Sequence, residues 1–166
     1  QKILPSGTTN LSYGIQKADI IGELIELNPY IRMTWSNTDY SSPILETKMI
    51  GRYNFYNFLA AICIGNHFGI SHNNISKAIE KYVPDNNRSQ VQETNKNTLI
   101  VDCYNANPDS FRAAIAQCRE VFDGRRRVVF AGSMLELGCF EASAHEDILH
   151  ELLRADFEVI AATGLF

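Results

Sequence analysis

A polar, turn-forming segment near the middle of the sequence divides it into two halves with different hydrophobic patterns. This segment, residues 84–89, reads Pro-Asp-Asn-Asn-Arg-Ser. Proline and asparagine favour turns, and exposed polar linkers of this kind commonly separate domains. A chain of 166 residues is long enough for one domain or two small ones. We therefore predict two domains, residues 1–84 and residues 85–166.

The first half predicts a strand meander followed by a pair of helices. Apolar side chains recur at steps of three and four over residues 55–63 and again over residues 75–82, which is the helical period. Runs rich in β-formers, separated by turn residues, occur around residues 11–13, 20–27, 31–35 and 45–50. The expected helix limits are Asn54 as the first N-cap, Asn73 or Asn74 as the second N-cap, and Pro84 as the end of the second helix.

The second half alternates strand and helix patterns. The expected elements are strands over residues 98–103, 127–131 and 158–162, and helices over residues 109–122 and about 142–154. Strands that alternate with helices of this length form βαβ units, whose strands lie parallel in one sheet. The expected fold class is therefore α/β, with a parallel sheet in the second half.

Two loops of the second half carry the polar side chains that could form a site. Residues 102–110 and residues 132–138 each follow a strand and lead into a helix. Ligands commonly bind at this edge of a parallel sheet, where helix N-termini offer unpaired N–H groups, and consecutive strands should bring the two loops together. The first loop also has a structural interpretation, in which Asn107-Pro108 makes the turn, Asp109 or Ser110 caps the helix, and Asp102 accepts backbone N–H groups.

Composition and charge exclude several classes of protein. A net charge of −4 and a pI near 5.5 provide no basic surface for nucleic acid. No apolar run approaches the roughly 20 residues needed to span a bilayer, so no membrane partner is expected. The four cysteines include no C-x-x-C pair, which favours reduced thiols and a cytoplasmic protein.

Familiar catalytic motifs are missing from the sequence. His145 and His150 resemble a zincin pair, but five residues rotate them about 140° apart around a helix, so they cannot share a zinc ion. The sequence has no Gly-Lys dipeptide and hence no G-x-x-x-x-G-K-[ST] phosphate loop, so ATP chemistry would need that loop from elsewhere. We expect no catalytic residue and no metal ligand. The chain starts at Gln1 without a methionine and stops directly after a strand pattern, which suggests a fragment.

Several motifs together resemble the Mur ligase family of ATP-dependent amide-forming enzymes. The run Tyr104-Asn105-Ala106-Asn107-Pro108 is the most specific, and it is similar to the branch of the family that uses D-alanyl-D-alanine. The other matching stretches are Tyr13-Gly14 with Ala18-Asp19, residues 51–61 (Gly-Arg-Tyr-Asn-Phe-Tyr-Asn-Phe-Leu-Ala-Ala), Asn87-Arg88, the rest of residues 102–110, and residues 132–138 with His145. The resemblance thus covers nearly the whole chain.

The resemblance implies a three-domain enzyme. This chain would hold the end of its P-loop-type central ATP-binding domain, to about residue 84, and the start of its Rossmann-like C-terminal domain. The implied reaction joins D-alanyl-D-alanine to UDP-N-acetylmuramoyl-tripeptide through an acyl phosphate in the cytoplasm, with ATP and Mg²⁺. The phosphate loop and magnesium ligands would lie outside this chain, so the fragment alone is expected to be inactive and to retain neither ATP nor Mg²⁺.

The resemblance also implies an ATP side of the site. Asn57 would hydrogen-bond the adenine edge, Arg88 would reach the phosphates or ribose, and Asp102 would take a ribose hydroxyl or orient the nucleotide. Asn57 could instead bond locally within its helix, and Arg88 could be a solvated linker charge. Two positions depart from the family pattern, because Asn87 stands where glycine is usual and Tyr53 where histidine is common.

By the same resemblance, Tyr104, Asn105 and Asn107 would line the D-alanyl-D-alanine side, although this loop could equally be shaped by its own turn. Two other functions stay open. A non-catalytic module that binds a nucleotide or a protein would need no phosphate loop. A folylpolyglutamate-type ligase shares the expected architecture, but the run over residues 104–108 argues against it.

Overall fold

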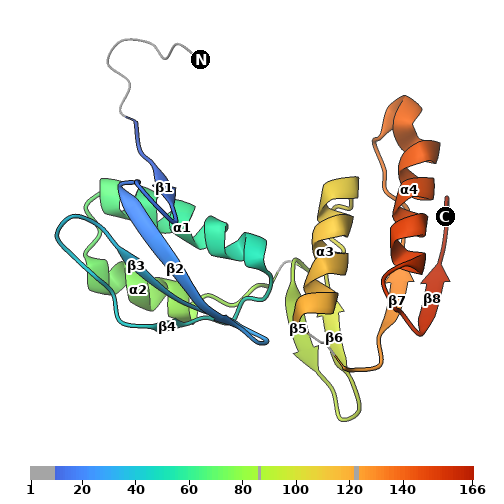
Figure 1. Cartoon of the computed structure of the whole chain (residues 1–166), viewed down its shortest axis with the longest axis horizontal. Helices are drawn as coiled ribbons and strands as arrows, with labels where there is room; N and C mark the ends of the chain where they lie inside the picture. The colour runs from blue at the N-terminus through green and yellow to red at the C-terminus, as the bar shows by residue number, and fades with distance from the viewer. Residues whose placement is uncertain (1–9, 86, 122–123) are drawn as a thin grey trace.

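The computed structural model describes residues 10–85, 87–121 and 124–166 (Figure 1). Three stretches lie outside this range: residues 1–9 of the predicted first domain, residue 86 of the linker, and residues 122–123 at the end of the helix expected over residues 109–122. The first half contains β1 (Tyr13–Gly14), β2 (Ile20–Leu27), β3 (Ile31–Ser36), β4 (Leu45–Glu46), α1 (Arg52–His67) and α2 (His72–Lys81). The second half contains β5 (Gln90–Glu93), β6 (Thr98–Val101), α3 (Pro108–Val121), β7 (Val128–Ala131), the 3₁₀ turn η1 (Gly138–Phe140), α4 (Glu141–Leu153) and β8 (Val159–Ala162). This order of strands and helices confirms the α/β fold class.

The first half is a four-stranded sheet covered by α1 and α2. Its strand order is β1-β2-β3-β4, with β1 parallel to β2 and the other pairs antiparallel. Alternate residues of β3, Ile31, Met33 and Trp35, are fully buried and belong to one core cluster with the apolar face of α1. The Trp35 indole N–H donates to Ser76 Oγ of α2 at 3.1 Å, which joins the sheet to the second helix. The predicted meander and helix pair are therefore present.

The predicted helix caps of the first half are wrong. Gly51, with φ +85°, precedes α1, and Asn54 is buried inside its first turn, where Asn54 Nδ2 donates to Ile50 O at 2.8 Å. Ser71 precedes α2, so Asn73 and Asn74 lie within the helix. A capping residue is defined by the backbone angle at which the chain enters the helix, and residue type alone does not determine that angle.

The strands of the second half do not form the single parallel sheet that was predicted. β5 and β6 form an antiparallel hairpin closed by a turn in which Thr94 N–H donates to Asn97 O at 2.8 Å. β7 and β8 form a separate parallel pair, so within the described residues β6 and β7 are not hydrogen-bonded neighbours of one sheet. The hairpin was missed because β5 is a short polar strand without an apolar alternation.

α3 and α4 begin at the same end of this half and pack against each other (Figure 1). The loops after β6 and β7 lead into these helices and therefore lie at one end. The core between the helices and the strands contains Ile115, Ala131, Met134, Ile148, Leu152 and Ala155. The opposite face of the β7–β8 pair exposes Val128, Phe130 and Val159, and the Phe130 side chain is 84% exposed.

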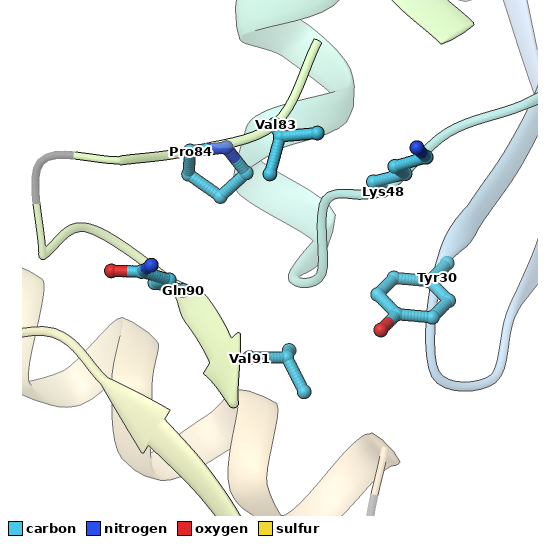
Figure 2. Close-up of a pocket in the computed structure, with 6 residues that line it drawn as sticks. All are labelled: Tyr30, Lys48, Val83, Pro84, Gln90 and Val91. Atoms are coloured by element: carbon cyan, nitrogen blue, oxygen red, sulfur yellow. The ribbon is translucent and has the colours of Figure 1, made fainter. Parts of the chain in front are cut away.

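The two halves meet where the first turn of α1 touches α3. A β-carbon at Gly51 would lie 2.4 Å from Gln117 Oε1, so any larger residue there would force the Gln117 side chain to move. Arg52 Nη2 donates to Glu120 Oε1 at 2.5 Å. A hollow of about 260 Å³ also lies between the halves. Figure 2 shows the residues that line it, with Val91 directed toward Tyr30. The hollow is lined by Tyr30, Lys48, Val83, Pro84, Gln90 and Val91. The position of the domain boundary stays a prediction.

Candidate active site

The linker between the halves runs along the end of β6. Asn87 O accepts a hydrogen bond from Cys103 N–H at 2.9 Å, and Asn87 has a φ of +56°. Asparagine tolerates this left-handed conformation better than most residues, which explains how it can replace a glycine here. The next residue, Arg88, places its guanidinium carbon 4.1 Å from the centroid of the Tyr104 ring. The linker cation is thus held against the loop that follows β6.

Asp102 lies beside this cation at the end of β6. Partial burial raises the pKa of the Asp102 carboxyl above its usual value, while the Ser89 backbone N–H and the charge of Arg88 oppose that increase. The Asp102 residue as a whole is nevertheless exposed, so its carboxyl stays accessible beside Arg88. Arg88 and Asp102 therefore lie together at the end of β6.

The first turns of α1 approach the same place. The Tyr53 hydroxyl forms a hydrogen bond with Ser89 Oγ in the linker, and burial raises the pKa of that hydroxyl. Asn57 lies one turn further along α1 and is exposed, with Nδ2 donating to Asn54 Oδ1 at 3.0 Å. The helix that carries Asn57 is thus tied to the linker that carries Arg88. Sequence reasoning assigned no role to Tyr53, because Asn54 as the expected N-cap left Tyr53 outside the helix, whereas α1 begins at Arg52.

The loop over residues 102–110 ends in a reciprocal helix cap. Asn107 Oδ1 accepts from Ser110 N–H at 2.9 Å, and Ser110 Oγ accepts from Asn107 N–H at 2.9 Å. Asn107 is therefore the cap of α3, and the expectation that Asp109 or Ser110 holds that position is wrong. This bond occupies the side-chain oxygen of Asn107, whereas Tyr104 and Asn105 are exposed.

The loop over residues 132–138, which follows β7, packs against the core of the second half, as the loop over residues 102–110 does. Ala106 of the first loop and Leu137 of the second both pack against one buried cluster, which includes the fully buried Met134. The two loops therefore border one core cluster, even though β6 and β7 belong to separate sheets. The sequence predicted that a shared sheet would bring the loops together, whereas in the structure their common neighbour is the core between α3, α4 and the strands.

Within residues 10–85, 87–121 and 124–166, no group of three or more His, Cys, Asp or Glu side chains could hold a metal ion. His145 is buried against Met134, whereas His150 is exposed, so the two imidazoles point apart. Across the same part of the chain, none of the helices combines the length and the apolar character that crossing a membrane requires.

The fold is that of an α/β protein in which each half packs helices against strands. Residues 87–164 match the family model described as Mur ligase, glutamate ligase domain. MurF from Acinetobacter baumannii superimposes on 93% of this chain and 33% of its own, with a TM-score of 0.82 and 27% identity. The chain belongs to the Mur ligase family.

Curated relatives agree with this assignment. The UDP-N-acetylmuramoyl-tripeptide–D-alanyl-D-alanine ligase of Treponema pallidum is 34% identical over 106 residues, which are 64% of this chain and 23% of the relative. The ligase of the same name from Bacillus subtilis is 34% identical over 101 residues, 60% of this chain and 22% of the relative. The chain therefore spans about a quarter of the length of these relatives. MurF from Thermotoga maritima in complex with ADP, at 18% identity and a TM-score of 0.74, shares the fold.

Proposed function

We propose that this chain forms part of an ATP-dependent ligase that joins D-alanyl-D-alanine to UDP-N-acetylmuramoyl-tripeptide. The observation that carries this proposal is the contact between Arg88 and Tyr104, which brings a phosphate-binding type of cation onto the Tyr-Asn-Ala-Asn-Pro loop. Relatives named for this reaction match at 34% identity, which supports the choice of substrates. Cytoplasmic location, where the soluble precursor is made, follows from the same proposal.

The proposed chemistry has two steps. ATP transfers its terminal phosphoryl group to the tripeptide carboxylate, giving an acyl phosphate and ADP. The amine of D-alanyl-D-alanine then attacks the acyl carbon, and the tetrahedral intermediate expels phosphate to leave the new amide. Because the acyl phosphate is already reactive, the protein contributes mainly by orienting the two reactants, stabilising charge and excluding water.

Three residues would serve the nucleotide. Arg88 would pair with phosphate oxygens, for which a guanidinium provides several donors in a plane. Asn57 would offer the donor and acceptor of its amide to the adenine edge. Asp102 would accept from a ribose hydroxyl, an interaction that lowers the cost of its partial burial. Mur ligases use ATP and Mg²⁺, but the described residues contain no cluster that fits the ion, so we assign none of them to it.

Two exposed residues of the β6–α3 loop, Tyr104 and Asn105, would contact the dipeptide. The side-chain oxygen of Asn107 already accepts from Ser110 N–H. Asn107 would therefore serve the dipeptide site by shaping the loop at the start of α3 and by offering its side-chain N–H groups. These assignments rest on the position of the loop at the junction and on its resemblance to the D-alanyl-D-alanine branch.

Other amide-forming ligases remain the main competitors. A 2,6-diaminopimelate ligase from Geobacillus thermodenitrificans is 30% identical over 113 residues, and the folylpolyglutamate synthase of Thermotoga maritima shares the fold at 14% identity. A panel of acceptors separates these functions. The longer protein containing this chain is incubated with ATP, UDP-muramoyl peptides or folate, and D-alanyl-D-alanine, diaminopimelate, L-alanine or glutamate. We expect D-alanyl-D-alanine to be the one acceptor that supports turnover, with the pentapeptide as product. Amide formation with a different acceptor and not with D-alanyl-D-alanine would contradict the proposal.

The same assay tests the nucleotide residues. Arg88→Ala and Asn57→Ala should raise the KM for ATP roughly tenfold, since each removes hydrogen bonds of about 1–2 kcal/mol. Arg119→Ala on α3 and Asn73→Ala on α2, both exposed, serve as matched controls and should leave the KM unchanged. The chain of 166 residues alone should neither hydrolyse ATP nor form product, and measurable turnover would refute its role as a part. If no acceptor supports turnover in the longer protein, the non-catalytic module becomes the better explanation.

A further inference from the structure

His145 is the most completely buried titratable side chain near the two loops. It projects from the first turns of α4 and is 2% exposed. Its Nε2 accepts a hydrogen bond from Met134 N–H at 2.9 Å, and its Nδ1 donates to Glu141 O at 2.6 Å. The backbone donor on one side and the backbone acceptor on the other require a neutral imidazole with its proton on Nδ1.

The partner of this imidazole lies in an irregular part of the chain. Met134 is in the loop between β7 and α4, outside any strand or helix, and its side chain is fully buried. A buried backbone N–H in such a loop finds no partner in a ladder and is costly when left unpaired. The imidazole of His145 supplies the acceptor that the loop lacks.

The rest of the loop is held from the other side. Ser133 Oγ accepts from Leu165 N–H at 2.9 Å, and the Phe166 ring packs edge-on against the imidazole with 4.8 Å between centroids. Glu136 adopts a φ of +64°, a conformation that a non-glycine residue keeps only when its surroundings enforce it. With Met134 buried and Ser133 fixed, Leu135 and Glu136 are presented outward at the end of β7.

We propose that His145 is a positioning residue that fixes the β7–α4 loop in the shape needed beside the dipeptide loop. The residue is buried and does not touch substrate; it acts through the backbone of Met134. This inference rests on the proposed function, because the β7–α4 loop borders the same core cluster as the loop over residues 102–110, which would line the D-alanyl-D-alanine side.

The first experiment uses the chain of 166 residues and does not depend on any activity. Nitrogen-15 NMR of the imidazole should show the Nδ1–H tautomer, and the Met134 amide should be protected from hydrogen exchange. His145→Leu fills the space but removes the acceptor, so Met134 protection should fall about 10- to 100-fold. His145→Gln places an oxygen near the former Nε2 and should restore most of it. His150→Gln, on the exposed side of the same helix, should change nothing.

Comparing the protection of the Met134 amide in the two variants distinguishes a positioning role of His145 from a packing role. If His145 only fills space, leucine should serve as well as glutamine or better, because the site is buried and packs against the Phe166 ring. Protection in His145→Leu equal to that in His145→Gln would therefore overturn the proposal, as would an exchanging Met134 amide in the unsubstituted chain.

The second experiment uses the intact ligase. His145→Leu should raise the KM for D-alanyl-D-alanine about tenfold with kcat within roughly threefold, and His145→Gln should recover most of that loss. An unchanged KM alongside lost Met134 protection would show that the loop is held by His145 but does not serve the substrate. If the intact protein accepts a different amine, the proposed function fails while the NMR result stands.

Discussion

The guanidinium carbon of Arg88 lies 4.1 Å from the centroid of the Tyr104 ring, so the segment between the two halves is stacked on the loop that follows β6. This contact joins the two sides of the proposed site, because Arg88 belongs to the nucleotide side and Tyr104 to the dipeptide side. A cation–π contact at an exposed position is worth about 0.5–1 kcal/mol. Stacking on the ring holds the cation in place and leaves its in-plane N–H groups free to donate to phosphate oxygens.

Replacing Tyr104 should therefore affect the use of ATP as well as that of the dipeptide. In the intact ligase, Tyr104→Leu should raise the KM for ATP by about two- to fivefold, the factor that corresponds to the lost contact. Tyr104→Phe keeps the ring and should leave the KM for ATP unchanged. Steady-state kinetics with each substrate varied in turn measures both effects. Equal KM values for ATP in Tyr104→Leu and Tyr104→Phe would show that the contact has no part in nucleotide binding.

Asp102→Asn should stabilise the fold at neutral pH. Burial raises the folded-state pKa of Asp102, so between the ordinary value of 3.8 and the raised value the folded chain holds more protons than the unfolded chain. The free energy of unfolding then falls as pH rises through that window, and the ionised carboxylate remains unfavourable at pH 7. Thermal unfolding should show a higher Tm for Asp102→Asn at pH 7 and no difference below about pH 4.

The control for this prediction is Asp85→Asn on the exposed linker, which should not change the Tm at pH 7. In the intact ligase, Asp102→Asn should also lower activity, because a residue kept at a cost in stability is expected to serve the ligand. A lower Tm at pH 7 would contradict the argument.

Gly51→Ala should destabilise the junction between the halves. The substitution brings a β-carbon against Gln117 Oε1 and places alanine at a φ of +85°, so a loss of about 2–4 kcal/mol is expected. Gly69→Ala is the matched control, because Gly69 has a φ of +73° and nothing within 4 Å of the added carbon. Urea unfolding of both variants separates the clash from the backbone strain.

A second variant tests whether Gln117 causes the difference. Gln117→Ala removes the clashing atom, and the double variant Gly51→Ala, Gln117→Ala should lose no more stability than Gly69→Ala. A double variant as unstable as Gly51→Ala would mean that strain at Gly51 accounts for the whole effect.

The pair Ser12 and Asp19 should contribute stability that disappears in acid. Asp19 Oδ2 accepts from Ser12 Oγ at 2.6 Å and from Ser12 N–H at 2.8 Å. Both bonds lower the pKa of Asp19, and the bond from the Ser12 hydroxyl has the larger effect. A lowered folded-state pKa gives stability that is present above the ordinary value of 3.8 and lost as pH falls through the folded value. Asp19→Asn should therefore lower the urea midpoint at pH 7, with the difference shrinking below pH 4. Ser12→Ala should reproduce this pH dependence, and a deficit that persists unchanged in acid would contradict it.

Phe130→Ser should reduce self-association without loss of stability. The Phe130 side chain is 84% exposed on the face of β7 and β8 that no helix of the described chain covers. Contiguous exposed apolar residues commonly promote association. Light scattering at high concentration should show a smaller mean mass for Phe130→Ser than for Tyr56→Ser, which removes an exposed aromatic ring from α1. A monomeric unsubstituted chain at high concentration would contradict this expectation.

Much of the fold follows from the sequence because hydrophobic periodicity reflects which face of an element is buried. The three- and four-residue steps that include Phe55, Phe58 and Leu59 predicted α1, and the apolar runs at residues 127–131 and 158–162 predicted β7 and β8. The polarity of the loops after β6 and β7 likewise marked the end of the second half where a ligand could bind. These are properties of neighbouring residues, which a local pattern can carry.

Tertiary structure alone decided which groups meet. The pairing of β6 with β5 instead of β7, the bond between Tyr53 and Ser89, and the hold of His145 on Met134 join residues whose separation in sequence follows no period. Such contacts depend on where packing places each element, because a hydrogen bond forms within about 3 Å and a small rotation of a helix breaks it. Residue types therefore determined what chemistry was available, and the packing of α1, α3 and α4 determined where it came together.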